Sequence, residues 1–239
     1  MENPIYVALS RQEALSRQLD VVANNIANMN TTGYKQQRML FQEYLEKPAR
    51  GERVSFVQDY GLMRDVRAGA LQVTNNTLDL ALKGEGYFTV ETLSGPRYTR
   101  AGNFQLNDRR ELVDQNGLPV LDSNDNRITI PDGTTDLKVQ GDGTVMADRA
   151  QVAKLKIVTF ADQQQMQTLG GGLMTTTQAP QPSANPQVTQ GAVEASNVQA
   201  IVESTAMIEV LRQYQITQKL VDEEHDRIRN AITHLAKAQ

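Results

Sequence analysis

Apolar side chains recur every seven residues near the N-terminus, and this spacing constrains the fold more than any other feature of the chain. The stretch opens with Asn3-Pro4, a favourable helix start because Asn caps free N–H groups and Pro fits the first helical turn. Gly33, after two threonines, is a helix-ending residue. The spacing predicts a coiled-coil-like helix from about residue 4 to about residue 30. The two rows are Ile5, Leu19 and Ile26, with Gln12 as the exception, and Ala8, Leu15, Val22 and Met29.

The C-terminus shows the same spacing. Ser196, followed three residues later by Gln199, resembles a capping box, and no Gly or Pro intervenes from there to Lys237. Gln218 and His225 interrupt a narrow apolar stripe, so we expect this helix to be marginal by itself in water. Both ends are therefore predicted to need a helical partner. The stripe comprises Met207, Tyr214, Val221, Ile228 and Leu235, flanked by Val210, Leu211 and Ile232.

The middle of the chain alternates with a period of two. The stretches TLDLALKG and KLKIVTF alternate apolar with polar residues, and turn signals such as Asn116-Gly117 separate such runs. The sequence predicts an α+β fold, in which terminal helices pair in a coiled-coil-like helical domain and a mostly antiparallel β domain is inserted between them. We expect residues 1–40 with 192–239 in the helical domain, 41–67 as a connection, 68–170 as the β domain and 171–191 as an extended linker.

Composition excludes several functional classes. The net charge of −4 and the lack of a basic run argue against nucleic-acid binding, and the absence of cysteine excludes disulfides and thiolate chemistry. No apolar run approaches the length of a membrane span, so we expect no membrane insertion. The N-terminus lacks the charged and apolar regions of a cleavable secretory signal.

Catalytic, cofactor-binding and metal-binding residues are not predicted. The two histidines, His225 and His234, lie about two and a half helical turns apart, too far to share a metal ion. Glycine-rich stretches lack the context of a phosphate site, and scattered carboxylates show no catalytic spacing. We therefore expect a protein that is not an enzyme. A glycan-binding or glycan-cleaving domain is the alternative, although the chain has no Trp for stacking on sugars.

An asparagine-rich, uncharged stretch ends the first helix. Between Val21 and Tyr34 there is no charged side chain, whereas a solvent-facing helix usually carries several. Asn24 and Asn28 fall opposite the apolar seam and Asn25 flanks it. Fraying of the helix end is one interpretation; burial against other protein is the other, and it also accounts for the missing charges, because amides both donate and accept. Head-to-tail packing of such helices would generate filaments or tubes.

The stretch ANNIANMNTTGYK, residues 23–35, resembles the signature segment of the bacterial flagellar rod and hook proteins. Ile26 and Tyr34 replace the usual Leu and Phe. TNNTLDLALKGEGYF and YTRAGNFQLN resemble the start of the family's β domain, and GAVEASNV resembles its return to the C-terminal helix. Near the C-terminus, LRQYQ keeps Arg212 and Tyr214 but departs from the family's usual Gln and Glu.

The resemblance implies a structural subunit of the basal-body rod, exported by the flagellar type III apparatus. Such subunits assemble with copies of themselves and with other rod proteins into a hollow drive shaft that crosses the periplasm and transmits torque. The chain's length and its short segment after the first helix favour the proximal rod type, with the distal rod type as the alternative. The implied subunit-interface residues are Leu15, Leu19, Val22, Ala23, Asn24, Asn25, Ile26, Ala27, Asn28, Gly33, Tyr34, Lys35, Ser196, Asn197, Met207, Leu211, Arg212, Tyr214, Val221 and Ile228.

Overall fold

The computed structural model describes residues 3–46 and 54–237 and divides the chain into two compact units. The first unit contains both terminal helices and residues 37–64, and the second contains residues 28–36 and 65–198. The chain therefore passes from one unit to the other four times. The α+β fold predicted from the sequence is confirmed, with helices at both ends and a mostly antiparallel β domain between them.

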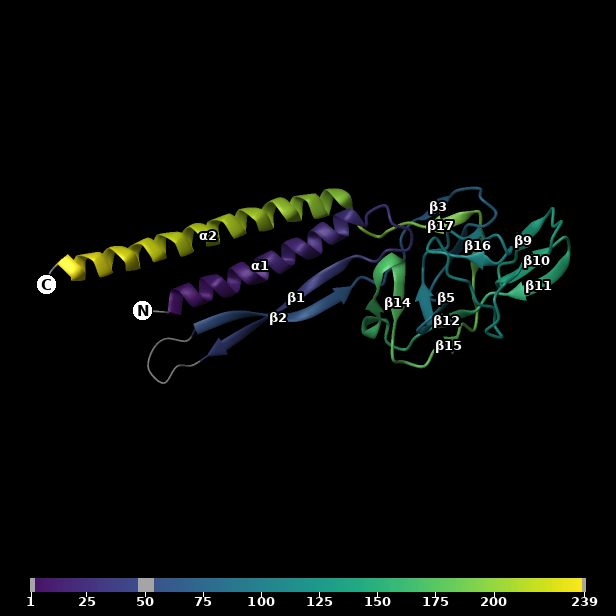
Figure 1. Ribbon diagram of the computed structural model, residues 1–239, viewed down its shortest axis with the longest axis horizontal. Coiled ribbons are helices and arrows are strands. Elements are labelled where there is room, and N and C mark those ends of the chain that lie inside the picture. Colours follow the sequence, from purple (N-terminus) through teal and green to yellow (C-terminus); the bar gives the residue numbers. More distant parts are fainter. Residues whose placement is uncertain (1–2, 47–53, 238–239) are drawn as a thin grey trace. The chain divides into compact units, whose positions relative to one another are not determined.

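The helical unit is built on two antiparallel helices, α1 (Asn3–Ala27) and α2 (Ala200–Lys237). Both seven-residue patterns thus lie on helices, and α1 contacts α2 along its length (Figure 1). The α1 helix stops at Ala27 rather than near residue 30, because Thr31 N–H bonds to Asn28 O at 3.1 Å and a turn follows. The side chains of Ile5, Ile232, His234 and Leu235 lie outside those that the structure describes.

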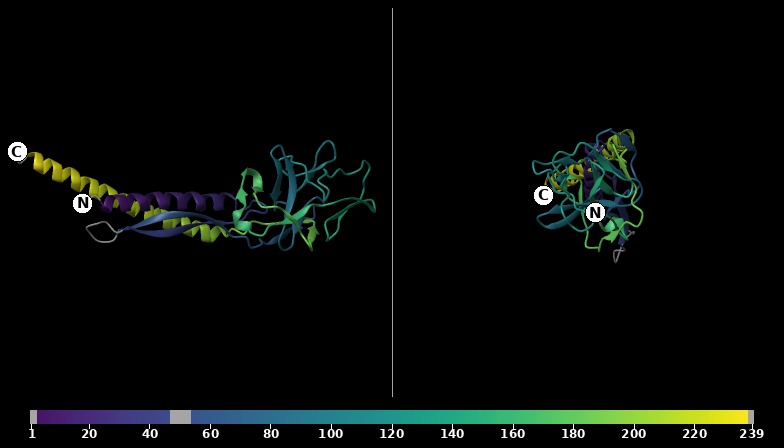
Figure 2. Two further views of the ribbon diagram at one scale, coloured as in Figure 1. Left: turned by 90° about the horizontal axis from the view of Figure 1, so that it is seen from below. Right: turned by 90° about the vertical axis from the view of Figure 1, so that its right-hand side faces the viewer.

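A long β-hairpin covers another side of α1. Strands β1 (Gln37–Glu46) and β2 (Val54–Arg64) pair antiparallel, and α1 lies between this hairpin and α2 (Figures 1 and 2). This segment differs from the connection expected over residues 41–67. The sequence showed no period of two there, although Phe41, Tyr44 and Phe56 are strand-favouring residues.

The β domain centres on a six-stranded sheet of order β13-β14-β6-β5-β12-β15. Its strands are β5 (Tyr87–Thr92), β6 (Gly95–Thr99), β12 (Ile157–Thr159), β13 (Gln167–Thr168), β14 (Leu173–Thr175) and β15 (Gln181–Pro182). A second sheet has the order β11-β10-β9, from β9 (Leu137–Val139), β10 (Thr144–Ala147) and β11 (Ala150–Lys154).

Three two-stranded pairings complete the domain. They join β16 (Val188–Gln190) to β4 (Leu80–Leu82), β17 (Ala192–Glu194) to β3 (Leu71–Val73), and β7 (Gln105–Leu106) to β8 (Leu112–Val113). The 3-10 turns are η1 (Gln163–Gln165) and η2 (Gly170–Gly172). The apolar core contains Leu80, Leu82, Phe88, Val90, Phe104, Leu112, Val120, Ile128, Ile130, Val145, Leu155 and Ile157.

Residues 171–191 were expected to be an extended linker, and here the structure differs. Strands β14, β15 and β16 lie within them and pair with β6, β12 and β4. Met174 and Val188 are buried in the domain. Composition rich in Pro, Gln, Thr and Ser therefore did not prevent short strands, because each one needs only two or three residues to pair with an existing strand.

A turn of the β9–β11 sheet depends on one carboxylate. Asp148 accepts hydrogen bonds from Thr135 N at 3.1 Å, Thr135 Oγ1 at 2.9 Å and Asp136 N at 2.9 Å. The bond from Asp136 N lowers the pKa of Asp148 most, and the bonds from Thr135 lower it further. A lowered pKa in the folded state means that the unfolded chain binds a proton more readily.

We expect the β domain to lose stability as the pH falls below about 4, where unfolded aspartates protonate. The contribution of Asp148 is present above its unfolded pKa and is lost as the pH falls through its lower folded pKa. Urea unfolding at a series of pH values, followed by near-ultraviolet circular dichroism of the buried tyrosines, measures this slope. Asp148→Asn should flatten it, whereas Glu85→Gln at an exposed position should not. Equal slopes in both variants would contradict the prediction.

Candidate functional site

A buried carboxylate joins three distant parts of the sequence within the β unit. The Glu194 side chain, on β17, is 1% exposed, and it forms ion pairs with Lys35 and with Arg100, whose Nε lies 2.9 Å from Oε2. Lys35 Nζ also donates to Arg67 O at 2.9 Å, and Gly69 N donates to Glu194 Oε1 at 3.0 Å. Burial lowers the pKa of Lys35, and the hydrogen bond and charge of Glu194 oppose that change. We call Lys35, Arg100 and Glu194 the ion cluster.

Arg100 extends this cluster to the turn before β5. Its Nη1 donates to Gly86 O at 2.6 Å and its Nη2 donates to Gly84 O at 2.7 Å. The guanidinium also lies over the Tyr87 ring, 5.9 Å from its centroid. The planar guanidinium of Arg100 thus donates to two carbonyls while it also forms an ion pair with one carboxylate, which a Lys could not do.

Gly33 allows the segment that follows α1 to pack against Glu194 and Arg100. Its N–H donates to Glu194 O at 2.7 Å, and its φ of +69° is a conformation that side chains disfavour. A Cβ at this position would lie 2.6 Å from the carbonyl carbon of Arg100. The turn therefore requires glycine for both conformation and space.

Asn197 closes the same region from the C-terminal side. Its Oδ1 accepts from Gln36 N at 2.7 Å, and its Nδ2 donates to Asp65 O at 2.9 Å and Arg67 O at 3.0 Å. Ser196 Oγ accepts from Val198 N at 3.2 Å, and α2 begins only at Ala200. The expected capping box between Ser196 and Gln199 is thus replaced by a local turn.

Two polar layers interrupt the apolar contact of α1 with α2. Asn25, 1% exposed, donates from Nδ2 to Gln37 O and to Glu203 Oε2, both at 2.8 Å, and its Oδ1 accepts from Gln37 N at 3.0 Å. Gln12 Nε2 donates to Tyr214 OH at 3.0 Å and to Gln218 Oε1. Two of the three residues that broke the sequence patterns, Gln12 and Gln218, therefore pair with each other and define the register of the helices.

Three family models match the chain, and each contains one residue of the ion cluster. The Flagella basal body rod protein model matches residues 5–35, the Flagellar hook protein FlgE/F/G D1 domain model matches residues 81–147, and the Flagellar basal body rod FlgEFG protein C-terminal model matches residues 189–233. The chain is also 40% identical to the flagellar basal-body rod protein FlgF of Caulobacter vibrioides, over 99% of both chains. The chain belongs to the flagellar basal-body rod protein family.

Further rod proteins match at lower identity. FlgF of Rhizobium meliloti is 33% identical over 98% of both chains. FlgG of Bacillus subtilis is 31% identical over 92% of this chain and 94% of its own length. The similarity thus extends to both rod types that the sequence left open, and it is higher for the two FlgF proteins.

The structure places the sequence-predicted residues of this rod protein in three settings. Gly33, Lys35 and Asn197 form contacts within the β unit. Asn28, Tyr34 and Ser196 belong to the same unit and are half-buried. Within the helical unit, Leu15, Val22 and Asn25 are buried, and the half-buried ones are Leu19, Ile26, Met207, Tyr214 and Val221. The exposed ones are Ala23, Asn24, Ala27, Leu211, Arg212 and Ile228.

Sequence reasoning missed a second apolar stripe on α2. Ile201, Ile208 and Ile216 are 83%, 61% and 62% exposed, and Val202 and Leu220 are exposed as well. The buried side of the helix carries Glu203, Val210 and Thr217 instead. The seven-residue spacing of Ile201 and Ile208 was the available signal. We call Ile201, Ile208, Ile216 and Leu220 the outer stripe.

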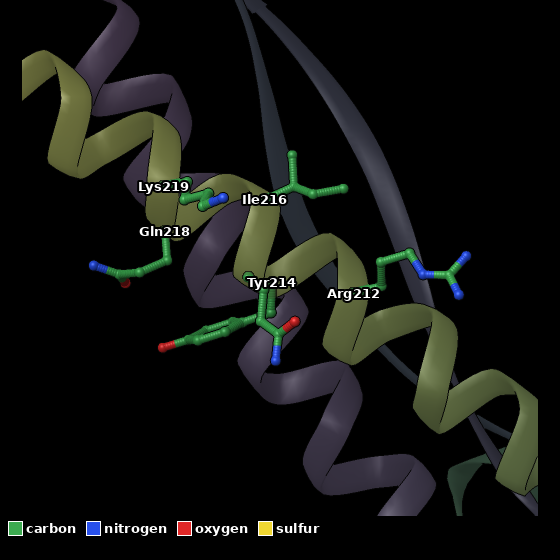
Figure 3. Close-up of a pocket in the computed structure, with 6 residues that line it drawn as sticks. Arg212, Tyr214, Ile216, Gln218 and Lys219 are labelled. Atoms are coloured by element: carbon green, nitrogen blue, oxygen red, sulfur yellow. The ribbon is translucent and has the colours of Figure 1, made fainter.

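An open hollow of about 440 Å³ adjoins the outer stripe midway along α2. Figure 3 shows Tyr214 and Gln218 on one side of the helix and Ile216 and Arg212 on the other. Among the residues that the structure describes, no cluster of acidic residues, histidines and cysteines suits a metal ion, and neither helix is long and apolar enough to cross a membrane. The outer stripe and the hollow beside it therefore offer apolar packing, hydrogen bonds and ion pairs to whatever binds them.

We expect Glu194→Gln to lower the free energy of unfolding by about 3–5 kcal/mol, because it leaves two buried cations without a counter-charge. Lys35→Met should cost less, since Arg100 still neutralises Glu194. Urea unfolding of the full chain at neutral pH measures both. The prediction fails if Glu194→Gln unfolds at the wild-type urea concentration or if Lys35→Met is the more damaging change.

Adjacent asparagines should behave differently. Asn25→Ala removes three hydrogen bonds of a buried side chain and should cost roughly 2–4 kcal/mol, because the Gln37 backbone and Glu203 lose their partner. Asn24→Ala, at an exposed position of the same helix, should change stability by less than about 0.5 kcal/mol. Thermal unfolding of both variants, followed by far-ultraviolet circular dichroism, makes the comparison. Similar losses of stability in both variants would contradict the prediction that Asn25 stabilises the helix pair more than Asn24 does.

Proposed function

We propose that this protein is a FlgF-type structural subunit of the flagellar basal-body rod, without catalytic activity. It assembles there with copies of itself and with other rod proteins. Two relatives called flagellar basal-body rod protein FlgF support this assignment, at 40% and 33% identity over nearly the whole chain. The FlgG of Bacillus subtilis, at 31%, makes the distal rod type the second candidate.

The observation that carries the assembly role is the outer stripe. Its isoleucines and leucine are all more than half exposed, although the opposite side of the same helix is already packed on α1. Exposed apolar surface of this extent on one element marks a protein interaction site. A helix that is packed on one side and apolar on its exposed side is built to lie between two partners.

The exposed members of the predicted interface are proposed to contact neighbouring subunits. On α1 these are Ala23, Asn24 and Ala27, which form a small and uncharged surface. On α2 they include Leu211, Arg212 and Ile228. The remaining predicted residues are proposed to act indirectly, by fixing the helix pair and the β unit in the shapes that the neighbours bind.

Family resemblance extends the proposal to the route and place of assembly. The subunit is proposed to leave the cell through the flagellar type III export apparatus and to form part of a shaft that crosses the periplasm and transmits torque. Export of an unfolded chain suits a helix pair whose apolar seam is narrow and broken by polar layers, because such a pair gains much of its order on assembly.

Deletion of this chain should abolish motility and stop flagellar assembly at the rod. Expression of the wild-type chain should restore both. Ile208→Asp should fail to restore motility, because a charge in the outer stripe opposes burial against a neighbour. Its circular dichroism should match the wild type, since the side chain is 61% exposed.

Ile208→Leu is the matched control and should restore swimming. Electron microscopy of basal bodies from each strain shows where assembly stops. Complete rods in the deletion strain would overturn the proposed function. Full swimming with Ile208→Asp would show that the outer stripe is not needed for the proposed function.

A further inference from the structure

The exposed side of α1 carries a row of side chains that complements the outer stripe of α2. Glu13, Ser16, Asp20 and Asn24 are exposed and follow one another at spacings of three and four residues, so they share one face of the helix. Ala23 and Ala27 flank them. Between residues 13 and 27 this face carries two acidic groups among small residues, with Arg17 beside them, and toward the N-terminus the same row continues to the exposed Leu9 and Tyr6. We call it the α1 outer face.

The face of α2 that carries the outer stripe has the opposite character. Ile208, Arg212, Ile216 and Lys219 are exposed at spacings of three and four residues, so bulky apolar and basic side chains share one face. The open hollow beside Arg212 and Ile216 lies on this part of α2 (Figure 3). Bulky side chains and two basic groups on α2 thus complement small side chains and two acidic groups on residues 13–27 of α1.

From these two faces we propose that the outer stripe of one copy binds the α1 outer face of a second copy. The proposal rests on the rod assignment and names the neighbour of that assembly. The two faces lie on different helices of each chain, so each copy offers one face and receives the other. Contacts of this head-to-tail kind extend from copy to copy.

Spacing sets the register of the contact. Within the chain the helices run antiparallel, as the pairs Gln12–Tyr214 and Asn25–Glu203 show. In an antiparallel contact, placing Glu13 opposite Lys219 also places Asp20 opposite Arg212, because both pairs are seven residues apart.

The same register matches the remaining side chains. Ile216 then lies opposite Ser16, and Ile208 lies opposite Asn24, so each bulky residue meets a smaller one. Relative to the pairing inside the chain, the second copy is displaced by about four residues, roughly 6 Å along the helix. A stagger of this kind favours a helical array over a flat ring.

Existing ion pairs do not prevent this exchange. Glu13 pairs with Arg17 at 2.6 Å and Arg212 pairs with Glu209 at 3.9 Å, and all four side chains are more than half exposed. Ion pairs so exposed are weak, so an intersubunit contact that excludes water can replace or extend them. In the proposed contact, the isoleucines supply affinity and the charges select the partner and its register.

Cysteine crosslinking tests the contact directly, because the chain has no cysteine of its own. Ser16→Cys and Ile216→Cys are placed on separate copies and expressed together in the deletion strain. Oxidation of isolated basal bodies should then give a covalent dimer. Ser16→Cys with Ile208→Cys is the matched control and should give none, because those positions are two turns out of register. No dimer with Ile216→Cys, or equal dimer with both partners, would overturn the proposal.

A charge exchange gives a second, independent readout. Asp20→Lys alone should abolish motility, and adding Arg212→Asp in the same chain should restore it. Asp20→Lys with Lys219→Asp has the same net charge but the wrong register, and it should stay non-motile. Rescue by both double variants or by neither would overturn the pairing.

The two proposals fail separately. A deletion strain that lacks the rod, together with absent crosslinks, would retain the rod assignment and reject this helix contact. A covalent product between Ile216→Cys and a different rod protein would likewise reject a second copy as the occupant. Complete rods in the deletion strain would reject both proposals.

Discussion

The structure depends on one buried carboxylate. Glu194 draws Lys35 from the end of the N-terminal segment and Arg100 from the β domain onto a single strand, β17. A charge removed from water is costly unless its partners surround it, so these contacts form together or not at all. Gly33 then packs on Arg100 because no side chain intervenes. The segment between α1 and β1 is thereby held in the β unit, although it lies between two elements of the helical unit in sequence.

The family's signature stretches contain residues that hold this chain's own fold together. Each of the three matching family models supplies one member of the ion cluster, so the motifs that identify the family are motifs of the monomer's own fold. Polar residues in the helix pair act in the same way. Asn25 and Gln12 weaken an apolar seam, but each has specific partners on α2, so a shifted register would leave buried amides unpaired. Specificity inside the chain is thus supplied by polar groups that an apolar pattern treats as exceptions.

Periodicity was enough to predict the terminal helices and the inserted β domain, because both rest on local spacing that one sequence displays. The ion cluster could not be predicted in this way, since Lys35 and Glu194 are 159 residues apart and nothing local links them. The hairpin β1–β2 was missed because its strands lack alternation of apolar and polar residues. Strands β14 and β16 were missed because they are too short to show a pattern and are stabilised by pairing with β6 and β4. The sequence treated the asparagines of the uncharged helix end as one group, but the structure divides them: Asn25 is buried within the chain, whereas Asn24 is exposed.

Exposure of the outer stripe presents a problem that two basic residues on the same face solve. Ile201, Ile208 and Ile216 would promote indiscriminate association if they stood alone on an uncharged helix. Arg212 and Lys219 interrupt them at regular intervals, and a basic residue on an apolar face makes a mismatched contact costly, because it is buried without an acidic partner. The apolar residues therefore allow tight packing, and the charges restrict it to a surface with acidic groups at the same spacing. In the proposed contact between copies, this restriction separates the correct neighbour from related subunits that share the same helix geometry.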